Sequence, residues 1–272
     1  MADPEQVAQH YAGSAFEFES IRLTELCPVE FAITKRMLDR WIPAGACVAE
    51  IGVGVGHYSE HLAARGCIIH LIDIAQRLLD AAAARLRNAG LEKQIAGMSL
   101  LSATDLSEID STSFDAVMML GPLYHLCDIS DRRRAVEEAA RILKTGGFLY
   151  GAAINRLPYF RDQFRQRPEV VVERREFHRQ LLQAGNVDPE HVPSLGFAHF
   201  STAEEFRSLF AGLFEEVILI GVESFTAAWQ PVLNSLPAEQ AEAWLDLVEQ
   251  TGILPEGLGA SDHYLFVGRK LG

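Results

Sequence analysis

Apolar and polar residues alternate along this chain in a pattern that predicts strands and helices in turn. The apolar run at residues 48–51 indicates a buried strand of a parallel sheet, and a helix begins near His57. A second apolar run covers residues 67–73, and residues 74–88 place leucines and alanines on one helical face. Three further strands are predicted at residues 100–106, 114–120 and 148–154. This alternation favours an α/β fold.

The loop after the first predicted strand carries glycine at three alternate positions, Gly52, Gly54 and Gly56. Glycine lets the backbone turn sharply and approach a ligand closely, because it has no Cβ to collide. The helix that follows turns its N-terminal amides toward the same crevice. The nicotinamide fingerprint needs Gly-x-Gly-x-x-Gly, and here His57 stands where its last glycine would fall. Glu50, two residues before the first glycine, suits a cationic ligand better than a pyrophosphate.

The next two predicted strands each lead to an acidic residue. Asp73 lies 19 residues after Gly54, the offset at which the second strand of a βαβ unit brings a carboxylate to a ribose diol. Asp105 follows the third apolar run, where its carboxylate could reach an adenine amino group. Together with the glycine loop, these acids indicate a cationic adenosyl ligand.

The ordered motifs resemble those of class I S-adenosylmethionine-dependent methyltransferases that act on small molecules. They are Glu50-x-Gly52-x-Gly54-x-Gly56, Asp73, Asp105, residues 121–126 and residues 143–147. The resemblance covers roughly residues 28–155. It implies a Rossmann-like three-layer sandwich around a seven-stranded, mostly parallel sheet with an antiparallel last strand, residues 214–223 and 262–269 being the final pair. It also implies S-adenosyl-L-methionine as cofactor and S-adenosyl-L-homocysteine as product.

The resemblance further implies where the cofactor sits and which residues surround it. Glu50 and the glycine loop would hold the methionine end, Asp73 the ribose, and Asp105 with Leu106 the adenine. The complete set of implied cofactor contacts is Glu50, Gly52, Gly54, Gly56, Tyr58, Asp73, Ile74, Asp105, Leu106, Leu120, Gly121 and Tyr11.

The catalytic candidates are Tyr124 and His125, which lie in the segment after the fourth predicted strand. They follow Gly121 at the mouth of the crevice nearest the methyl group. His125 could remove a proton from a hydroxyl or amine acceptor near neutral pH. The alternative is that both residues shape the pocket or cap the next helix.

Four segments are expected along the chain. Residues 1–45 form an N-terminal helical lid, and residues 46–155 form the S-adenosylmethionine-binding core. Residues 156–197 form a helical cap insertion, with helices at about 158–166 and 169–184. Residues 198–272 complete the core with the antiparallel strand pair and an inserted helix near 237–249. Insertions over the carboxyl ends of strands naturally form lids and caps.

Six arginines crowd into the expected cap, between Arg161 and Arg179. One interpretation is a solvated helical face on which interleaved acids neutralise them. The other is that one or two of them hold a carboxylate or phosphate of a small substrate.

Composition narrows the expected partners and location. A net charge of −13 argues against nucleic acid, because neutralisation of phosphates dominates that affinity. No apolar run approaches the roughly 18 residues that span a membrane, and the acidic start lacks a secretory core. We therefore expect a cytoplasmic enzyme acting on a small-molecule acceptor, with no nucleic-acid or membrane partner, as a monomer or homodimer.

Several alternatives share parts of these motifs. Residues 57–61 read His-x-x-Glu-His, a zinc signature, but they also begin the helix after the glycine loop and lack a third ligand, so no metal is expected. Methyl transfer by in-line displacement to an oxygen, nitrogen or sulfur atom is the expected reaction. Cyclisation of the amino-acid arm of S-adenosylmethionine, or binding without catalysis, would use the same motifs. The chain lacks an Asn-Pro-Pro-Tyr motif, which argues against base or amide methylation.

Overall fold

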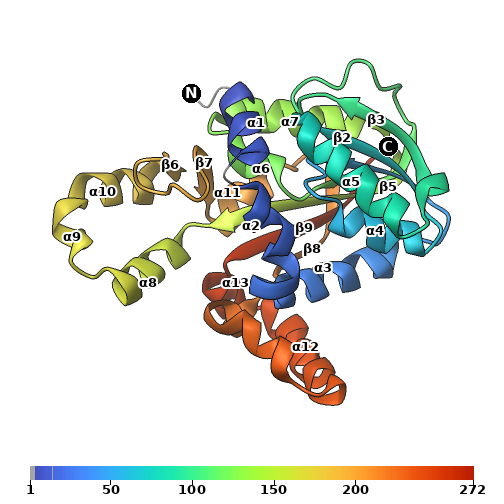
Figure 1. Ribbon diagram of the computed structural model, residues 1–272. Coiled ribbons are helices and arrows are strands. Elements are labelled where there is room, and N and C mark those ends of the chain that lie inside the picture. The colour runs from blue at the N-terminus through green and yellow to red at the C-terminus, as the bar shows by residue number, and fades with distance from the viewer. Residues whose placement is uncertain (1–3, 14) are drawn as a thin grey trace.

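A mostly parallel sheet forms the middle layer of the computed structural model, which describes residues 4–13 and 15–272 (Figure 1). Its strands are β1 (Cys47–Ile51), β2 (Ile68–Asp73), β3 (Ile95–Leu100), β4 (Phe114–Met119), β5 (Leu143–Asn155), β6 (Asn186–Val187), β7 (Ala198–Ser201), β8 (Phe214–Gly221) and β9 (His263–Lys270). They run in the order β3-β2-β1-β4-β5, and β9 and then β8 extend the sheet beyond β5. β9 is antiparallel to β5 and to β8, which confirms the predicted fold class with its antiparallel last strand.

The sheet has nine strands, and the prediction of seven was wrong. The additional strands, β6 and β7, pair with each other, and β7 attaches to the carboxyl end of β5. They have room there because β5 continues to Asn155, past its last pairing with β4 at Gly151. On the edge left free, Ile154 pairs with Phe200 and Asn155 with Ser201. Strands of two and four residues carry too little periodicity to be predicted.

The third strand ends earlier than the sequence pattern suggested. It was expected at residues 100–106, whereas β3 ends at Leu100. Ser102 begins a turn, because its hydroxyl accepts the backbone N–H of Thr104 at 3.3 Å and its carbonyl accepts that of Asp105 at 3.0 Å. Serine and threonine favour such local hydrogen bonds over a strand ladder.

Helices cover both faces of the sheet. They are α3 (Pro28–Trp41), α4 (His57–Ala64), α5 (Gln76–Asn88), α6 (Pro122–His125), α7 (Ile129–Ile142), α11 (Ala203–Ser208) and α12 (Ala238–Gly252), with a short 3-10 turn, η2 (Glu92–Gln94). Successive strand residues point to opposite faces, so Val48 and Met118 pack with α3, α4 and α5, whereas Ala49 and Val117 pack with α7 and α11. The result is the expected three-layer sandwich.

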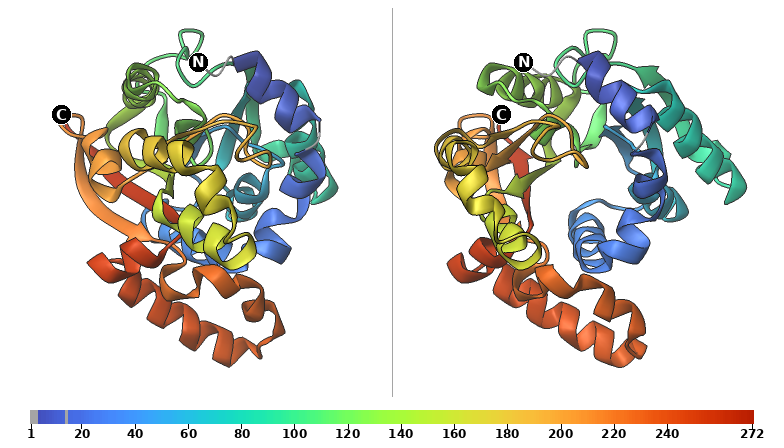
Figure 2. Two further views of the ribbon diagram at one scale, coloured as in Figure 1. Left: turned by 90° about the vertical axis from the view of Figure 1, so that its left-hand side faces the viewer. Right: turned by 60° about the vertical axis from the view of Figure 1, so that its left-hand side comes forward.

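The N-terminal segment before β1 is mostly helical in its described part. It consists of α1 (Pro4–Ala12), α2 (Phe16–Ile21), a π-helical turn η1 (Arg22–Leu26) and α3, and Figure 2 shows α1 and α2 in dark blue at one side of the molecule. The turn η1 is closed by the Cys27 N–H, which donates to the Arg22 carbonyl oxygen at 2.7 Å. We call α1, α2 and η1 the leader.

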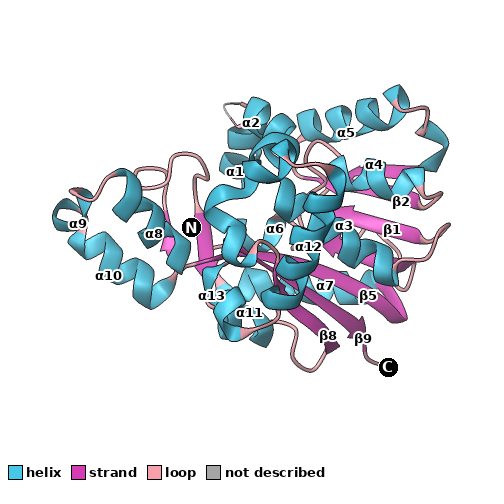
Figure 3. Cartoon of the chain, turned by 90° about the horizontal axis from the view of Figure 1, so that it is seen from below, coloured by secondary structure: helices cyan, strands magenta, loops and turns pink. Residues whose placement is uncertain are grey.

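The cap consists of α8 (Leu157–Gln166), α9 (Val170–Glu173) and α10 (Arg175–Ala184), and it projects from one end of the sandwich (Figure 3). The predicted second cap helix is broken, with Arg174 between α9 and α10. Tyr159, Phe177 and Leu181 pack with Phe200 of β7 in a small core of their own. The strand pair β6 and β7 therefore supplies the apolar floor on which the cap rests.

The segment between β8 and β9 forms the last addition. It contains the 3-10 segment η3 (Ser224–Ser235), α12 and α13 (Pro255–Ala260), and it contacts α3 and β8. Among the described residues, no helix combines the length and apolar character that a bilayer crossing would require.

Candidate functional site

A pocket lies at the carboxyl ends of β1, β2 and β4, with the leader forming its outer wall. Twelve of the fourteen sequence-predicted site residues line it, namely Tyr11, Glu50, Gly52, Gly54, Gly56, Tyr58, Asp73, Ile74, Leu120, Gly121, Tyr124 and His125. We call it the crevice. Residues far apart in the sequence meet here because parallel strands deliver their carboxyl ends to one edge of the sheet.

The glycine loop brings its backbone to the wall of this crevice. Gly54 has a φ of +55°, and a Cβ placed on it would meet no atom within 4 Å. Gly52, by contrast, has a φ of +74°, and a Cβ there would lie 2.7 Å from the ring of Pro122. Gly52 therefore lets two loops touch, whereas Gly54 leaves space that a ligand can enter.

Asp73 fastens the two loops at the bottom of the crevice. Its Oδ2 accepts the Gly54 N–H at 3.1 Å and its Oδ1 accepts the Ala75 N–H at 2.9 Å. Burial raises the pKa of Asp73 to about 6, although these backbone donors act in the opposite direction. The carboxylate is held in place but carries no cationic partner among the described residues.

Glu50 is also buried, and none of the described residues places a cation beside it. The Ser59 hydroxyl donates to its Oε2, and only 2% of the residue is exposed. Burial raises the pKa of Glu50 to about 8, and the charge of Asp73 adds to the increase. Because burial disfavours the ionised form of both acids, a positively charged ligand in the crevice would stabilise that form.

His125 has both ring nitrogens engaged. Its Nδ1 lies 3.1 Å from the carbonyl oxygen of Phe197, and its Nε2 lies 2.7 Å from the hydroxyl of Tyr11. Because a carbonyl only accepts, Nδ1 carries the proton and the Tyr11 hydroxyl donates to Nε2. Burial lowers the pKa of His125 to about 4. The neutral ring therefore ties the leader to α6 and to the loop before β7.

Asp105 and Leu106 lie away from the crevice. The Asp105 side chain is at the surface, where its Oδ1 accepts the Ser107 N–H at 3.2 Å. Leu106 is fully buried in the core beside α7. Leu101, Ser102 and Ala103 line the crevice in their place. Because β3 ends at Leu100, the residues that line the crevice are those directly after the strand, and Asp105 and Leu106 come too late in the chain.

A second pocket adjoins the crevice beneath the cap, and we call it the cap pocket. Tyr11, Glu19, Arg22 and Tyr124 line both pockets and form the wall between them. The cap pocket is also lined by Asn155, Tyr159, Gln163, Arg167, Arg174, Asp262 and His263, among others. The sequence motifs pointed to neither Glu19 nor His263.

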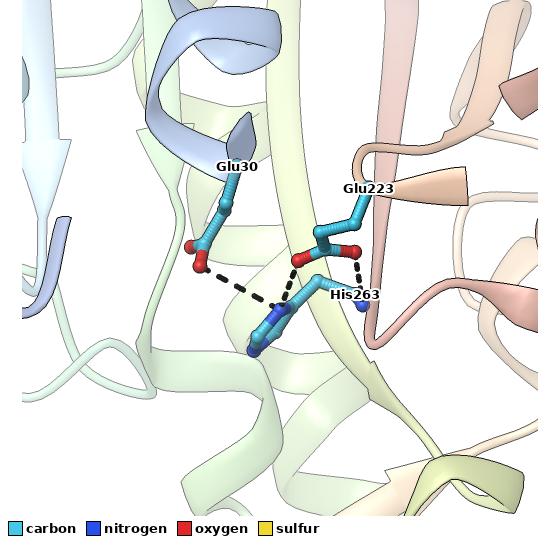
Figure 4. A group of neighbouring side chains, drawn as sticks. All are labelled: Glu30, Glu223 and His263. Carbon is cyan, nitrogen blue, oxygen red and sulfur yellow. Dashed lines mark hydrogen bonds and ion pairs between the residues drawn. The ribbon is translucent and has the colours of Figure 1, made fainter. Parts of the chain in front are cut away.

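Glu223, which is buried, pairs with the half-buried His263 at this pocket (Figure 4). Glu223 Oε1 lies 2.7 Å from His263 Nδ1, and Oε2 accepts the Asp262 and His263 N–H groups at 3.0 and 2.9 Å. Glu30 Oε2 lies 3.6 Å from the same nitrogen. Burial alone would lower the pKa of His263, but Glu30 and Glu223 outweigh it and raise it to about 9.

The position of this pair follows from the antiparallel pairing of β8 and β9. Glu223 comes two residues after β8, and His263 is the first residue of β9, where the two strands meet. The predicted pairing of the last two strands therefore implied that these two residues lie near each other. No sequence motif indicates the contact itself, because the residues lie 40 positions apart.

Glu30, Glu223 and His263 offer ligand atoms within 4.8 Å of one another, as a metal site requires. The carboxylate oxygens of Glu30 and Glu223, however, already take part in hydrogen bonds or ion pairs. Arg22 donates to Glu30 Oε2 at 2.6 Å and to Glu30 Oε1 at 3.1 Å. Glu223 Oε2 accepts from Ser261 as well as from two backbone N–H groups. The two carboxylates are thus occupied by protein N–H and O–H groups.

The two histidines of the zinc signature have different partners. His57 Nε2 lies 3.2 Å from the Ser20 carbonyl oxygen, and His61 Nε2 lies 2.8 Å from Asp39 Oδ1. Within the described chain, neither belongs to a group of potential metal ligands.

Three of the cap arginines, Arg161, Arg167 and Arg179, pair with nearby acids. Arg161 contacts Asp162 and Asp262, and Arg179 contacts Glu176. Arg174 differs, because its Nη1 donates to the carbonyl oxygen of His191 at 3.2 Å. Arg174 also lines the cap pocket, so both interpretations of the arginine cluster find support in different members.

Fold and crevice together agree with the resemblance to class I S-adenosylmethionine-dependent methyltransferases. Residues 49–151 match the family described as a methyltransferase domain, and this confirms the resemblance. A ubiquinone biosynthesis O-methyltransferase of Xanthomonas oryzae pv. oryzae is 34% identical over 137 residues, 50% of this chain and 53% of that protein. Its counterpart in Xanthomonas axonopodis pv. citri is 32% identical over 136 residues, with the same coverage. The chain thus spans about half the length of these curated relatives.

Solved structures share the fold over nearly the whole chain. The 4+2 cyclase SpnF has a TM-score of 0.64 at 19% identity, covering 99% of this chain and 97% of its own. The N-methyltransferase NodS of Bradyrhizobium japonicum, in complex with S-adenosyl-L-homocysteine, has a TM-score of 0.57 at 15% identity, covering 98% of each chain. At such identities these likenesses concern the fold.

Proposed function

We propose that this chain transfers the methyl group of S-adenosyl-L-methionine to an oxygen, nitrogen or sulfur atom of a small molecule. The observation that carries the proposal is the crevice, where Glu50, Gly54 and Asp73 meet at the carboxyl ends of β1 and β2. Its buried acids have no cationic partner in the described part of the chain, and its glycine loop leaves open space. The names of the curated relatives agree with this activity.

The residues present fit this cofactor by their charge and shape. When bound, S-adenosylmethionine supplies a methyl group already activated by the sulfonium charge. Asp73 would accept hydrogen bonds from the ribose diol, and Glu50 would lie near the positively charged methionine end. Gly54 leaves the space for close approach.

The protein itself contributes alignment and exclusion of water. The leader closes the outer side of the crevice through the Tyr11–His125 hydrogen bond, and the cap covers the adjoining pocket. An acceptor held in the cap pocket would meet the cofactor at the shared wall of Tyr11, Arg22 and Tyr124. Alignment of a nucleophile with the S–CH₃ bond supplies a large part of such rate accelerations.

One incubation distinguishes acceptor-dependent methyl transfer from cyclisation of the amino-acid arm, two reactions that would use the same cofactor motifs. A fold neighbour described as a cyclase keeps the whole architecture, so the fold alone does not define the reaction. Purified protein is incubated with S-adenosylmethionine alone, and the products are separated by chromatography. Methylthioadenosine would indicate cyclisation of the amino-acid arm, whereas unchanged S-adenosylmethionine agrees with acceptor-dependent transfer.

Calorimetric titration with S-adenosyl-L-homocysteine tests the cofactor site itself. We expect one binding event per chain. Absence of binding by the folded protein would overturn the proposed function. Binding without methylation of any acceptor in a broad panel of hydroxyl, amine and thiol compounds would favour a non-catalytic role.

A further inference from the structure

The ring of His263 presents one nitrogen to protein acids and leaves the other for a ligand. Its Nδ1 faces Glu223 and Glu30, and Nε2 lies on the opposite side of the ring (Figure 4). Within the described chain, Nε2 makes no hydrogen bond, and His263 lines the cap pocket. Glu223 fixes Nδ1 as the protonated nitrogen, so a neutral ring would carry its lone pair on Nε2.

The carboxylate behind the ring is itself held firmly. Glu223 is fully buried, and its Oε2 accepts three hydrogen bonds, from the Ser261 hydroxyl and from two backbone N–H groups. The Asp262 and His263 N–H groups come from the same strand end as the ring. This arrangement fixes the ring orientation as an orienting carboxylate fixes the base in hydrolases.

His263 lies close to the wall between the two pockets. Glu30 Oε2 is 3.6 Å from His263 Nδ1 and 2.6 Å from Arg22 Nη1, and Arg22 lines both pockets. A molecule in the cap pocket can therefore contact His263 and still border the crevice. His125 does not offer this, because Tyr11 and Phe197 occupy both of its nitrogens.

We propose that His263 accepts the proton of an acidic hydroxyl group on the methyl acceptor, with Glu223 as the positioning residue. The inference rests on the proposed function and refines it, because it names an oxygen acceptor of the phenol or enol class. The O–H bond breaks, and its proton bonds to Nε2. The oxygen electron pair forms the O–CH₃ bond, while the pair of the C–S bond stays on sulfur in S-adenosylhomocysteine. The imidazolium then releases its proton to water.

The charges around the ring favour an acidic hydroxyl over an alcohol. Glu30 on α3, Glu223 after β8 and the neighbouring Asp262 face His263, and Arg22 on η1 opposes them. The resulting pKa of His263, about 9, lies close to that of a phenol, which is about 10 in tyrosine. Proton transfer is efficient when donor and base are matched in this way.

The test compares two probes of similar shape and different acidity, catechol and 4-nitrocatechol, with S-adenosylmethionine as donor. Catechol must lose a proton to react, whereas the nitro group leaves 4-nitrocatechol ionised without help. We expect His263→Gln to lower catechol methylation by at least about 100-fold, the usual contribution of a general base. The same variant should lower methylation of 4-nitrocatechol far less. S-adenosylhomocysteine affinity should stay unchanged, because His263 lies outside the crevice lining.

The pH profile identifies the group that titrates. For the wild-type protein, catechol methylation should rise with pH and level off near pH 9. Glu223→Gln removes a carboxylate that raises the pKa of His263, so the rise should move to lower pH. If this variant fails to fold, Glu30→Gln reports the same shift, because Glu30 acts in the same direction. A purely structural role would leave the profile in place.

His61→Gln is the matched control, since His61 pairs with Asp39 and lies outside both pockets. Equal losses for both probes, or an unchanged profile in His263→Gln, would overturn the proton-accepting role. Methylation of aniline or thiophenol by the wild-type protein without any methylation of catechol would overturn the hydroxyl class, as would turnover of no probe. Failure to bind S-adenosylhomocysteine would instead overturn the proposed function.

Discussion

The crevice and the cap pocket share a wall but are built in different ways. The crevice takes its residues from short segments at strand ends, chiefly residues 50–58 and 120–125. The cap pocket draws on the leader, β5, the cap and the start of β9. A site made from local motifs is visible in a sequence, whereas a site assembled from distant segments requires the fold. The cofactor is therefore easier to infer than the acceptor.

The largest expected effect is at Gly54. Gly54→Arg should abolish S-adenosylhomocysteine binding in calorimetry, because the side chain enters the open space in the crevice and the φ of +55° disfavours it. Gly66→Arg is the control, since Gly66 has a φ of +84° and open space but lies outside both pockets. Equal binding by both variants would show that the glycine loop does not contact the cofactor.

Asp73 and Asp105 allow the two parts of the sequence prediction to be compared directly. Asp73→Ala should weaken S-adenosylhomocysteine binding by about 10- to 100-fold, which corresponds to a hydrogen bond with a charged acceptor. Asp105→Ala should leave the affinity unchanged, because Asp105 lies at the surface outside the crevice lining. A weakened Asp105→Ala variant would show that the loop after β3 rearranges around the ligand.

The acidity of Glu50 predicts a pH dependence of binding. With a pKa of about 8, Glu50 is mostly protonated at pH 6, and a cationic ligand favours its ionised form. Affinity for S-adenosylmethionine should therefore rise from pH 6 to pH 8, by up to about tenfold per pH unit, and level off above. Calorimetry in buffers of different ionisation enthalpy should detect the released proton. Glu50→Gln should flatten this part of the profile.

The smallest expected effect concerns the wall between the pockets. Tyr11→Phe removes the hydroxyl that donates to His125, and one such hydrogen bond contributes about 1 kcal/mol, or roughly fivefold in affinity. We expect this loss mainly in the dissociation rate of S-adenosylhomocysteine, measured by stopped flow. Tyr150→Phe is the control, because the buried Tyr150 hydroxyl makes no hydrogen bond within the described residues. Equal rates in the two variants would argue that the leader does not retain the ligand.

The sequence carried much of the fold because its core elements are strongly periodic. The strands at residues 48–51 and 114–120, and the helix at 74–88, lie within two residues of where they were predicted. β3 was misplaced because Leu101 and Leu106 continue an apolar pattern through what is a turn. Local hydrogen bonds of Ser102 favour a turn in this segment, although its apolar residues favour a strand.

The candidate site likewise contains residues whose position could be predicted from the sequence and residues whose contacts could not. Glu50 and Asp73 reach the crevice as predicted, because parallel strands place their carboxyl ends together. His125 also reaches it, but the hydrogen bonds of its ring come from Tyr11 and Phe197, on two distant segments. The chemistry of a histidine depends on such partners, and spacing along the chain does not reveal them.

The π-helical turn η1 makes the leader unusually sensitive to its length. The Cys27 N–H bonds to Arg22, five residues back, so this turn holds one residue more than an α-helical turn. Removing a single residue here would convert the wide turn into an α-helical one and shift the residues upstream relative to α3. Arg22 would then leave the wall between the pockets, and Glu19 and Tyr11 would turn with it. Deletion of one of the last three residues of η1 would thus disturb both pockets at once, although none of the side chains that line the crevice would be lost.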